Sequence, residues 1–369
     1  MDENDVMNGE NVNVVDTLDK TDAKCPCCGA PIGYDPETRM LKCEYCGYTE
    51  EIKFDSEDDV VHEQDFDEAA FTADQNWGAE KKTVICKACG AEAVYDALQT
   101  SNICEYCGSN HVMEASADDT MAPNGVVGFL ISVKDAGARF TKWIKGKWFT
   151  PRKAKQSAKP EAFRSIYLPY WTFDADTTTV YSARYGRDRT VRDSKGNTRV
   201  VTDWYSTSGV YGEFFDDCLV CGTDRHNADI IDRIEPFNTS ECKPYKPEYV
   251  AGHISERYTI GIKSAWEKAK ARIQSRLRSN ITSHIKSTCR ADRVSNLTMR
   301  TTYSNKKYKY IILPVWMSSF TYKNKVFRFM VNGQTGKVGG KAPVSPLRVA
   351  IAIVLGVAAA WGLWYLLNS

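Results

Sequence analysis

Four Cys-x-x-Cys pairs in the first third of the chain constrain its fold more than any other feature. Fourteen residues separate the two pairs of the first set, and the whole set recurs 61 positions further on. Two residues between cysteines let one tight turn present two thiolates to one ion, and four thiolates close the tetrahedral shell of a structural zinc site. The sequence therefore predicts two structural zinc ions, each held in a small β zinc ribbon without an open position for catalysis. The expected ligands are Cys25, Cys28, Cys43 and Cys46 in the first ribbon and Cys86, Cys89, Cys104 and Cys107 in the second.

A disulfide framework and a redox pair are the alternatives to a metal. A disulfide scaffold needs an oxidising compartment and a secretory signal. Residues 1–22 instead carry seven acidic side chains and one lysine, which is the opposite of the positive start of a signal peptide. We therefore expect a reducing compartment. Iron in a rubredoxin-like site uses the same four ligands and stays open as a second metal, and Cys27 is expected to be a spare thiol.

The carboxyl-terminal end carries an uncharged apolar run over residues 349–367. At about 1.5 Å per residue, a helix of this length reaches close to the thickness of the hydrocarbon core. The run lacks the polar stripe expected of a buried helix in a soluble domain. Basic residues precede it and none follows, so the positive-inside rule predicts a single-pass, tail-anchored protein of the bacterial cytoplasmic membrane, with its amino-terminal bulk in the cytoplasm. These basic residues are Lys337, Lys341 and Arg348.

Charge divides the chain into two parts. Residues 1–120 hold 28 acidic and 8 basic side chains, whereas residues 121–369 hold 19 acidic and 40 basic ones. A zinc ribbon that grips duplex DNA usually neutralises phosphates with lysine and arginine. Because the amino-terminal part that holds these ribbons is acidic, we expect it to bind a protein partner.

Composition and periodicity predict an α+β fold with two small β zinc ribbons, a larger α+β domain and one carboxyl-terminal transmembrane helix. The expected organisation is a disordered acidic tail over 1–22, zinc ribbon 1 over 23–49, an acidic linker over 50–80, zinc ribbon 2 over 81–112, a second linker over 113–124, the α+β domain over 125–341 and the transmembrane helix over 347–367.

Two amphipathic helices are predicted in the larger domain. Residues 133–148 alternate aromatic and basic side chains, which fits either a surface helix docked on the domain or a helix lying on an anionic bilayer. Residues 262–290 have apolar positions at three- and four-residue steps and a basic opposite face. That face is either solvated or turned toward nucleic acid, lipid or the acidic part of the chain.

A short motif occurs twice in the larger domain. Leu168-Pro169 with Trp171 matches Leu313-Pro314 with Trp316. Each copy is expected to open a β-rich segment, where a proline breaks no ladder. The pair is compatible with an internal duplication, although two short matches do not prove one.

Several constellations are discounted. Residues 332–337 resemble a phosphate-binding loop, but two residues stand where a Walker loop needs four between its glycines, so a hairpin turn is expected. Cys218 and Cys221 form a third Cys-x-x-Cys. His226 and Cys242 would have to complete a metal site with them, and we prefer the interpretation that they are buried strand cysteines. No catalytic pattern surrounds the histidines, and His253 with Glu256 are the best of weak enzyme candidates.

Several motifs of the chain occur together in a known family. They are the two Cys-x-x-Cys-Gly pairs of each ribbon, Asn76-Trp77-Gly78, the two Leu-Pro-x-Trp motifs, Ala251-Gly252-His253 with Glu256, residues 331–337 and the apolar tail. With these motifs the chain resembles the bacterial TFIIB-type zinc-ribbon-containing proteins, which are often mislabelled as PriA-type replication helicases. The resemblance implies a membrane protein found beside SPFH-domain proteins and, in some bacteria, linked to recruiting them to stressed membranes. A helicase motor would need a nucleotide-binding loop and a second acidic motif, and the sequence shows neither.

Taken together, the sequence predicts a non-enzymatic membrane scaffold whose ribbons recruit a protein, with an SPFH-type partner suspected and anionic lipid as a further partner. The alternative is a membrane-tethered nucleic-acid-binding protein, related to replication or transcription, that uses basic residues such as Arg272, Arg276 and Arg278.

Overall fold

The computed structural model describes most of the larger domain and part of the amino-terminal third. The described residues are 25–30, 32–53, 61–66, 81–86, 92–96, 112–114, 121, 123–157, 163–192, 196, 198–250, 253–256, 258–323 and 325–368, with 81–86, 92–96 and 112–114 as backbone alone.

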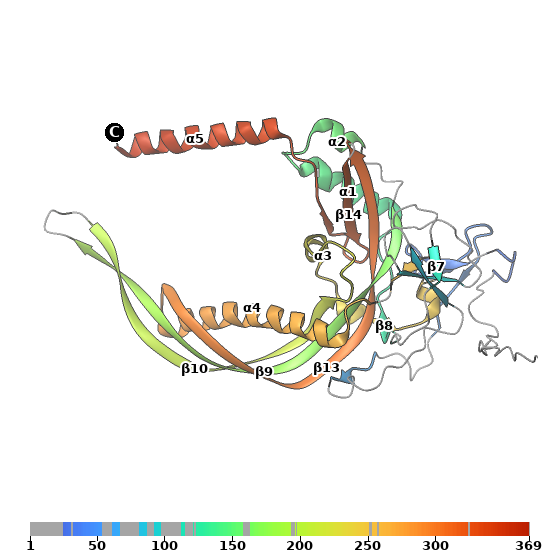
Figure 1. Ribbon diagram of the computed structural model, residues 1–369, viewed down its shortest axis with the longest axis horizontal. Coiled ribbons are helices and arrows are strands. Elements are labelled where there is room, and N and C mark those ends of the chain that lie inside the picture. The colour runs from blue at the N-terminus through green and yellow to red at the C-terminus, as the bar shows by residue number, and fades with distance from the viewer. Residues whose placement is uncertain are drawn as a thin grey trace, which may run out of the picture.

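Three long antiparallel strands dominate the fold. The central strand, β9, pairs with β10 on one side and with β13 on the other, and the three curve together into an arm (Figure 1). Beyond Asp174, β9 alternates between side chains that face the helix on the concave side and exposed ones, which is the period of two expected of a sheet covered on one face. These strands are β9 (Arg164–Arg192), β10 (Thr198–Cys221) and β13 (Arg293–Tyr322).

Helix α4 (Ile262–Cys289) lies along the concave side of the arm (Figure 1). The helix predicted over 262–290 is therefore confirmed. Its apolar positions recur every three or four residues, so they form one stripe that packs on the sheet. The buried residues of this stripe are Ala265, Trp266, Ala269, Ile273, Leu277, Ile281 and Ile285.

Shorter elements complete a mixed α/β fold. The remaining helices are α1 (Val133–Gly146), α2 (Arg152–Ser157), α3 (Ala228–Ile234) and α5 (Pro346–Asn368), with 3-10 turns η2 (Thr239–Glu241) and η3 (Pro247–Val250). The remaining strands are β1 (Gly33–Asp35), β2 (Met40–Lys42), β3 (Thr49–Glu50), β4 (Gln64–Asp65), β5 (Lys81–Cys86), β6 (Glu92–Asp96), β7 (Val112–Glu114), β8 (Gly125–Val126), β11 (Lys243–Pro244), β12 (Ile254–Ser255), β14 (Lys325–Asn332) and β15 (Val338–Gly340).

The central sheet is buried on both faces where β9 and β13 run side by side. Along β9, Tyr167 and Trp171 contribute to a core on the side of α1 and α4, whereas Ile166, Leu168 and Tyr170 contribute to a second core on the side of α3. Successive side chains of a strand point to opposite faces, so one continuous apolar run supplies both cores.

The two Leu-Pro motifs lie directly opposite each other. In the antiparallel register of β9 and β13, Leu168 faces Leu313 and Pro314 faces Tyr167. The expectation that each motif opens a strand is wrong for the second, because Pro314 lies deep within β13. It is tolerated there because the outer neighbour of β13 changes at this point from β8 to β14, so the missing N–H falls in a gap between two ladders.

The surroundings of the two motifs are also duplicated. We call residues 124–131 loop A and residues 253–260, of which 257 lies outside the described part, loop B. Strand β8 of loop A runs parallel to β13, and strand β12 of loop B runs parallel to β9. The end of each loop donates two N–H groups to one glycine carbonyl, at 2.9 Å from both Leu130 and Ile131 to Gly333, and at 2.8 and 2.9 Å from Thr259 and Ile260 to Gly222.

Each duplicated unit continues into a helix, with one residue between the last residue of the loop and the first residue of the helix. Loop A leads into α1 and loop B into α4. The two motif tryptophans pin these ends, since Trp316 donates to the carbonyl of Ile131 and Trp171 donates to that of Ile260, both at 2.8 Å. The structure thus supports the internal duplication that the motif pair indicated.

Two parts of the amino-terminal third join the large sheet. Within the predicted acidic linker, strand β4 pairs with β13, and Phe66 packs against Trp266 at 5.4 Å between ring centroids. The backbone of β5, β6 and β7, from the second predicted ribbon, extends the sheet through β12. The 1–22 tail, residues 54–60 and 67–80 of the linker, and residues 87–91 and 97–111 of the second ribbon lie outside the described part of the chain.

Helix α5 is long and apolar enough to cross a membrane. Its span over 346–366 contains one charged side chain, that of Arg348, and none of its residues is buried inside the protein. It leaves the body beside α1 and α2 (Figure 1). A core helix of a soluble protein would be covered, so this exposure agrees with the predicted membrane span.

Candidate metal centre

The first predicted ribbon is built from two knuckles and a three-stranded sheet. Strands β1, β2 and β3 form a small antiparallel sheet, and the cysteine pairs lie in the turns that flank it. In each turn the N–H of the glycine after the pair donates to the first cysteine's carbonyl, from Gly29 to Cys25 at 2.8 Å and from Gly47 to Cys43 at 2.9 Å. Both glycines have positive φ angles, 74° and 77°, a conformation that glycine adopts without strain.

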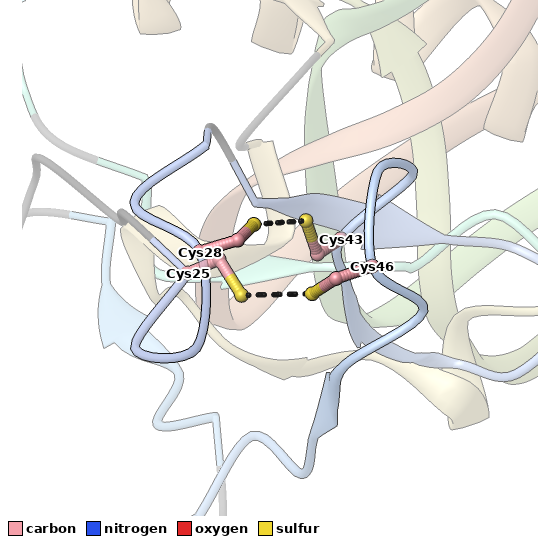
Figure 2. A group of neighbouring side chains, drawn as sticks. All are labelled: Cys25, Cys28, Cys43 and Cys46. Atoms are coloured by element: carbon pink, nitrogen blue, oxygen red, sulfur yellow. Dashed lines mark hydrogen bonds between the residues drawn. The ribbon is translucent and has the colours of Figure 1, made fainter.

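The four sulfur atoms of this ribbon lie together (Figure 2). The Cys25 and Cys46 Sγ atoms are 3.3 Å apart, those of Cys28 and Cys43 are 3.6 Å apart, and all four lie within 4.8 Å of one another. Zn–S bonds of about 2.3 Å at tetrahedral angles place sulfurs about 3.8 Å apart. The donor set and its spacing therefore fit one tetrahedral metal ion. Each knuckle contributes one buried cysteine, Cys25 or Cys43, and one exposed cysteine, Cys28 or Cys46.

The electrostatics of the knuckle favour a thiolate at Cys25. Burial alone would raise the pKa of this thiol, but hydrogen bonds from the backbone N–H groups of Cys27 and Cys28 and from neighbouring thiols lower it to about 7. Hydrogen bonds with the other thiols contribute to a raised pKa at Cys28 and to a pKa of about 12 at Cys46, so the four thiols share their protons, and a metal ion that binds them all must displace these protons.

The ribbon is docked on the body through Tyr34 of β1. The Tyr34 hydroxyl donates to the carbonyl of Phe129 in loop A at 3.3 Å, and its ring packs on Tyr249 at 5.4 Å. Gly128 makes room for it, because a Cβ there would lie 2.6 Å from the Tyr34 hydroxyl. The backbone of the metal ribbon is thereby tied to the core of the larger domain.

His253 of loop B completes this contact. Its Nε2 lies 3.1 Å from the carbonyl oxygen of Tyr34, and its Nδ1 lies 2.7 Å from the Ser165 hydroxyl. A carbonyl can only accept, so Nε2 carries the proton of the neutral ring and Nδ1 accepts from Ser165. Burial lowers the pKa of His253 to about 4. The imidazole is thus neutral at physiological pH and joins the ribbon to β9.

The outer side of the ribbon exposes its second knuckle. Tyr45, between Cys43 and Cys46, is 81 % exposed. Cys27 is also exposed and does not belong to the sulfur cluster, as expected of a spare thiol. A large aromatic side chain held in water by a rigid turn is a typical anchor for a protein partner.

The second predicted metal site cannot be placed in the same way. Cys86 ends β5, whose backbone alone is described, and Cys89, Cys104 and Cys107 lie outside the described residues. The sequence prediction for these four ligands stays a prediction.

The third Cys-x-x-Cys does not form a cluster among the described residues. Cys218 and Cys221 lie three positions apart on β10, so their side chains face opposite sides of the sheet and join different cores. Burial raises the pKa of Cys218 to about 11 and that of Cys221 to about 12. Cys242 joins the second core, and His226 contacts Glu256 instead of either thiol. These positions agree with the preferred interpretation as buried strand cysteines.

The enzyme candidates His253 and Glu256 have separate partners. Glu256 is fully buried and accepts from His226 Nε2 at 2.8 Å and from the Thr223 hydroxyl at 3.4 Å, and Arg225 lies at 3.8 Å. None of these contacts joins it to the pair of His253 and Ser165. The two residues are therefore parts of two polar contacts in the body, on either side of strand β12.

Sequence reasoning did not single out an acidic cluster in the arm. Asp174, Asp216 and Asp217 meet where a β-bulge interrupts the pairing of β9 and β10. Lys309 already supplies a cation, since its Nζ lies 2.8 Å from Asp217. Burial raises the pKa of Asp174 to about 7. Adjacent aspartates before a cysteine gave no signal of this meeting, which depends on strand pairing.

The motif over 332–337 is a structural turn. The Asn332 side chain is fully buried; its amide donates to the carbonyls of Ile234 and Pro236, and its oxygen accepts from the N–H groups of Gln334 and Thr335. Every polar atom of this side chain is engaged within the protein, so it fastens β14 to the segment after α3. The predicted hairpin turn is confirmed.

Comparison with known proteins places the chain beside one protein without an assigned activity. It is similar to the uncharacterized protein YdjG of Bacillus subtilis strain 168, with 29 % identity over 335 residues that cover 89 % of this chain and 91 % of the relative. No protein-family model matches the chain. No solved structure is similar to it. The similarity therefore covers most of the length of both chains.

Proposed function

We propose that the protein is a non-enzymatic, tail-anchored scaffold at the cytoplasmic face of a bacterial membrane, and that its metal ribbons recruit a protein partner. The observation that carries the proposal is the exposed Tyr45 on a knuckle whose cysteines converge on one metal position. A structural metal fixes such a turn without chemistry of its own. Helix α5, which is long enough to cross a bilayer, would hold this binding surface at the membrane.

Zinc is the metal that we propose for the cluster. Four cysteine thiolates form the usual shell of a structural zinc ion, and the second set of cysteines has the same spacing. In this role the ion supplies folding free energy, because a ribbon this small buries too little apolar surface to fold alone. We therefore infer two zinc ions per chain, one in each ribbon.

The partner is proposed from the resemblance to TFIIB-type zinc-ribbon proteins. That resemblance implies an SPFH-domain protein in the same membrane. The acidic charge of the amino-terminal part favours a partner with a basic or apolar docking surface over nucleic acid.

The nucleic-acid alternative is less well supported. It relies on basic residues of α4, but Arg272 pairs with Asp232 and Glu235, each at 2.9 Å, and Arg276 lies 3.8 Å from Glu213. Arg278 donates to the carbonyl of Leu297. Guanidinium groups held by carboxylates and carbonyls of their own chain are poor ligands for phosphate.

Crosslinking in cells followed by purification of the full chain tests the proposal. We expect an SPFH-type membrane protein to copurify with the wild type and to be lost with Tyr45→Ala in combination with Tyr106→Ala, its sequence equivalent in the second ribbon. Nuclease-sensitive nucleic acid without a protein partner would contradict the proposal and favour the alternative.

Metal content gives a second, independent test. Cys43→Ser should remove one equivalent of zinc per chain and unfold ribbon 1, because Cys43 is a fully buried ligand. Cys27→Ser is the matched control in the other knuckle and should keep both equivalents. Equal zinc content in the two variants, measured by mass spectrometry of the purified protein, would exclude the cluster as a metal site.

A further inference from the structure

The turn between α1 and α2 is fastened to the first residues of α5. Ser345 donates its N–H to the carbonyl of Phe149 at 2.8 Å. Arg348 donates to the carbonyls of Trp148 and Thr150, the latter at 2.9 Å. These bonds join the turn to both ends of the first helical turn of α5, so the two segments keep a fixed relative position.

This attachment determines where the turn lies relative to a bilayer. Arg348 is the last charged residue before the apolar run of α5, and a helix advances only about 1.5 Å per residue. The hydrocarbon boundary must therefore fall close to Arg348. Because Arg348 holds the backbone of Trp148 and Thr150, the α1–α2 turn lies within the headgroup layer, whatever the tilt of α5.

The side chains at the turn suit this position. Trp148 is 54 % exposed and Phe149 is 42 % exposed, and they contact each other edge to face at 5.0 Å between ring centroids. Val344 and Leu347 are also exposed, and they lie within two residues of Ser345, whose N–H is bonded to Phe149. Exposed aromatic and aliphatic side chains next to a membrane span are typical of the bilayer interface.

Positive charge surrounds these apolar side chains. The segment 136–157 contains seven basic residues and no acidic one. The helix α1 buries its apolar face through Phe140 and Ile144, so that its lysines are turned outward. The exposed basic residues of the segment are Arg139, Lys142, Lys145, Lys147, Arg152 and Lys153.

We propose that the α1–α2 turn is a binding surface for anionic phospholipid headgroups. Trp148 and Phe149 enter the interface and the surrounding lysines and arginines contact lipid phosphates, which concentrates phosphatidylglycerol-type lipids around the point where α5 enters the membrane. The proposal rests on the membrane anchoring proposed above and adds a lipid specificity to it. Each lysine close to an anionic surface strengthens binding roughly fivefold, so three of them have a large effect.

Three lysines of this surface can be exchanged with a matched control. Lys142, Lys145 and Lys153 are exposed on or beside α1 and α2, and the control uses Lys263, Lys268 and Lys286, which are exposed on α4. In both sets, three Lys→Gln changes remove the same charge from helix surfaces. Each full-length protein is reconstituted in phosphatidylcholine vesicles that contain phosphatidylglycerol as the minor lipid.

The readout is the preference for spin-labelled phosphatidylglycerol over spin-labelled phosphatidylcholine among the lipids that the protein immobilises. The wild type and the α4 control should prefer phosphatidylglycerol at least severalfold, and the preference should fall to near unity in the Lys142, Lys145 and Lys153 variant. Equal preference in all three proteins would overturn the proposal. The proposal would also be overturned if the wild type showed no lipid preference but bound a labelled nucleic-acid duplex, and if this binding were lost in the Lys142, Lys145 and Lys153 variant.

Two further measurements separate this proposal from the one on which it rests. Resistance of the wild type to alkaline extraction shows whether α5 is inserted; failure there contradicts membrane anchoring itself. The difference in tryptophan fluorescence between the wild type and the Trp148→Phe variant reports on Trp148 alone. We expect lipids brominated near the headgroup to quench this fluorescence. An inserted protein whose Trp148 emission is unaffected by these lipids would overturn the lipid surface and leave the anchoring intact.

Discussion

Loops A and B occupy equivalent places beside the two Leu-Pro motifs, yet their side chains have diverged. Val127 of loop A donates its N–H to the carbonyl of Ile312, and Glu256 of loop B donates in the same way to that of Tyr167. At this shared backbone position one loop buries a valine and the other a carboxylate. The backbone hydrogen bonds thus preserve the duplicated framework, whereas the side chains adapt each copy to a different neighbour.

The helices that follow the loops differ in the same way. Loop A leads into the short α1, and the turn after α1 is hydrogen-bonded to the start of α5. Loop B leads into the long α4, which packs against the arm. Ribbon 1 docks between the loops, through Phe129 of loop A and His253 of loop B. The duplicated unit therefore supports the start of α5 through one copy and the arm through the other, and the cysteine-rich ribbon contacts both copies.

The largest expected effect comes from making loop B resemble loop A at the divergent position. Glu256→Val removes a fully buried carboxylate that contacts both His226 and Arg225, and a buried ion pair that loses one partner costs about 3–5 kcal/mol. Chemical unfolding of the purified full chain measures the change. Glu256→Gln keeps the shape and an acceptor and should cost less, about 1–2 kcal/mol. A valine variant as stable as the wild type would show that the two loops are interchangeable here.

A pH effect is expected at the next divergent pair, Asn124 and His253. Asn124 accepts from the N–H of Tyr310 at 2.8 Å and cannot titrate. Burial lowers the pKa of His253 to about 4, below its ordinary 6.5, so the unfolded chain binds the proton more readily. Stability present above pH 6.5 should be lost as the pH falls toward 4, by roughly 3 kcal/mol in total.

His253→Asn gives loop B the residue of loop A and isolates this effect. Protonation of cysteine ligands also destabilises the protein at low pH, but it does so equally in both proteins. The difference in unfolding free energy between wild type and variant should therefore shrink steadily from pH 6.5 to pH 4. A difference that does not depend on pH would mean that folding leaves the pKa of His253 unchanged.

A smaller difference in stability is expected between alanine variants of Gly333 and Gly222, whose carbonyls accept the hydrogen bonds from the ends of loops A and B. A Cβ at Gly333 would lie 2.6 Å from a ring carbon of Phe129, whereas a Cβ at Gly222 would lie no closer than 3.2 Å to the carbonyl of Pro169. Gly333→Ala should destabilise the chain by about 1–3 kcal/mol through overpacking, and Gly222→Ala by less than about 1 kcal/mol. Thermal unfolding of the two variants side by side tests this order, and the reverse order would refute the packing difference.

The sequence predicts those parts of the molecule that are governed by local spacing. Cysteine intervals predicted the four side chains that come together in ribbon 1, apolar periodicity predicted α4, and the length of an uncharged run predicted α5, because each depends on residues that are close in the chain. The equivalence of loops A and B was visible only in the two Leu-Pro motifs. Its hydrogen bonds come from the backbone, which allows the loop sequences to diverge.

Long-range contacts account for most of what the sequence did not reveal. Tyr34 docks on residues of both loops, and nothing near it in the sequence marks it as a core residue. The pairing of β9 with β13 places Pro314 inside a strand, against its local preference. The contact of Arg348 with the α1–α2 turn likewise joins two segments 200 residues apart in the chain.

The smallest effect concerns the helix starts, where the duplicated framework is nearly identical. The residues before α1 and α4, Ser132 and Gly261, have φ and ψ angles of −67° and 161° and of −64° and 159°. Ser132 accepts the N–H of Asp135 at 3.2 Å, while Gly261 has no side chain to do so. A Cβ at Gly261 would meet no atom within 4 Å, so Gly261→Ser should add the missing cap.

We expect Gly261→Ser to stabilise the chain by about 0.5 kcal/mol and Ser132→Ala to destabilise it by about 1 kcal/mol. The two sites begin different helices, so their effects in the double variant should add. Thermal unfolding of the four proteins measures both values. Gly261→Ser could leave the stability unchanged while Ser132→Ala lowers it. In that case the two helix starts would differ in more than their side chains, and the structural equivalence of the two units would end before the helices begin.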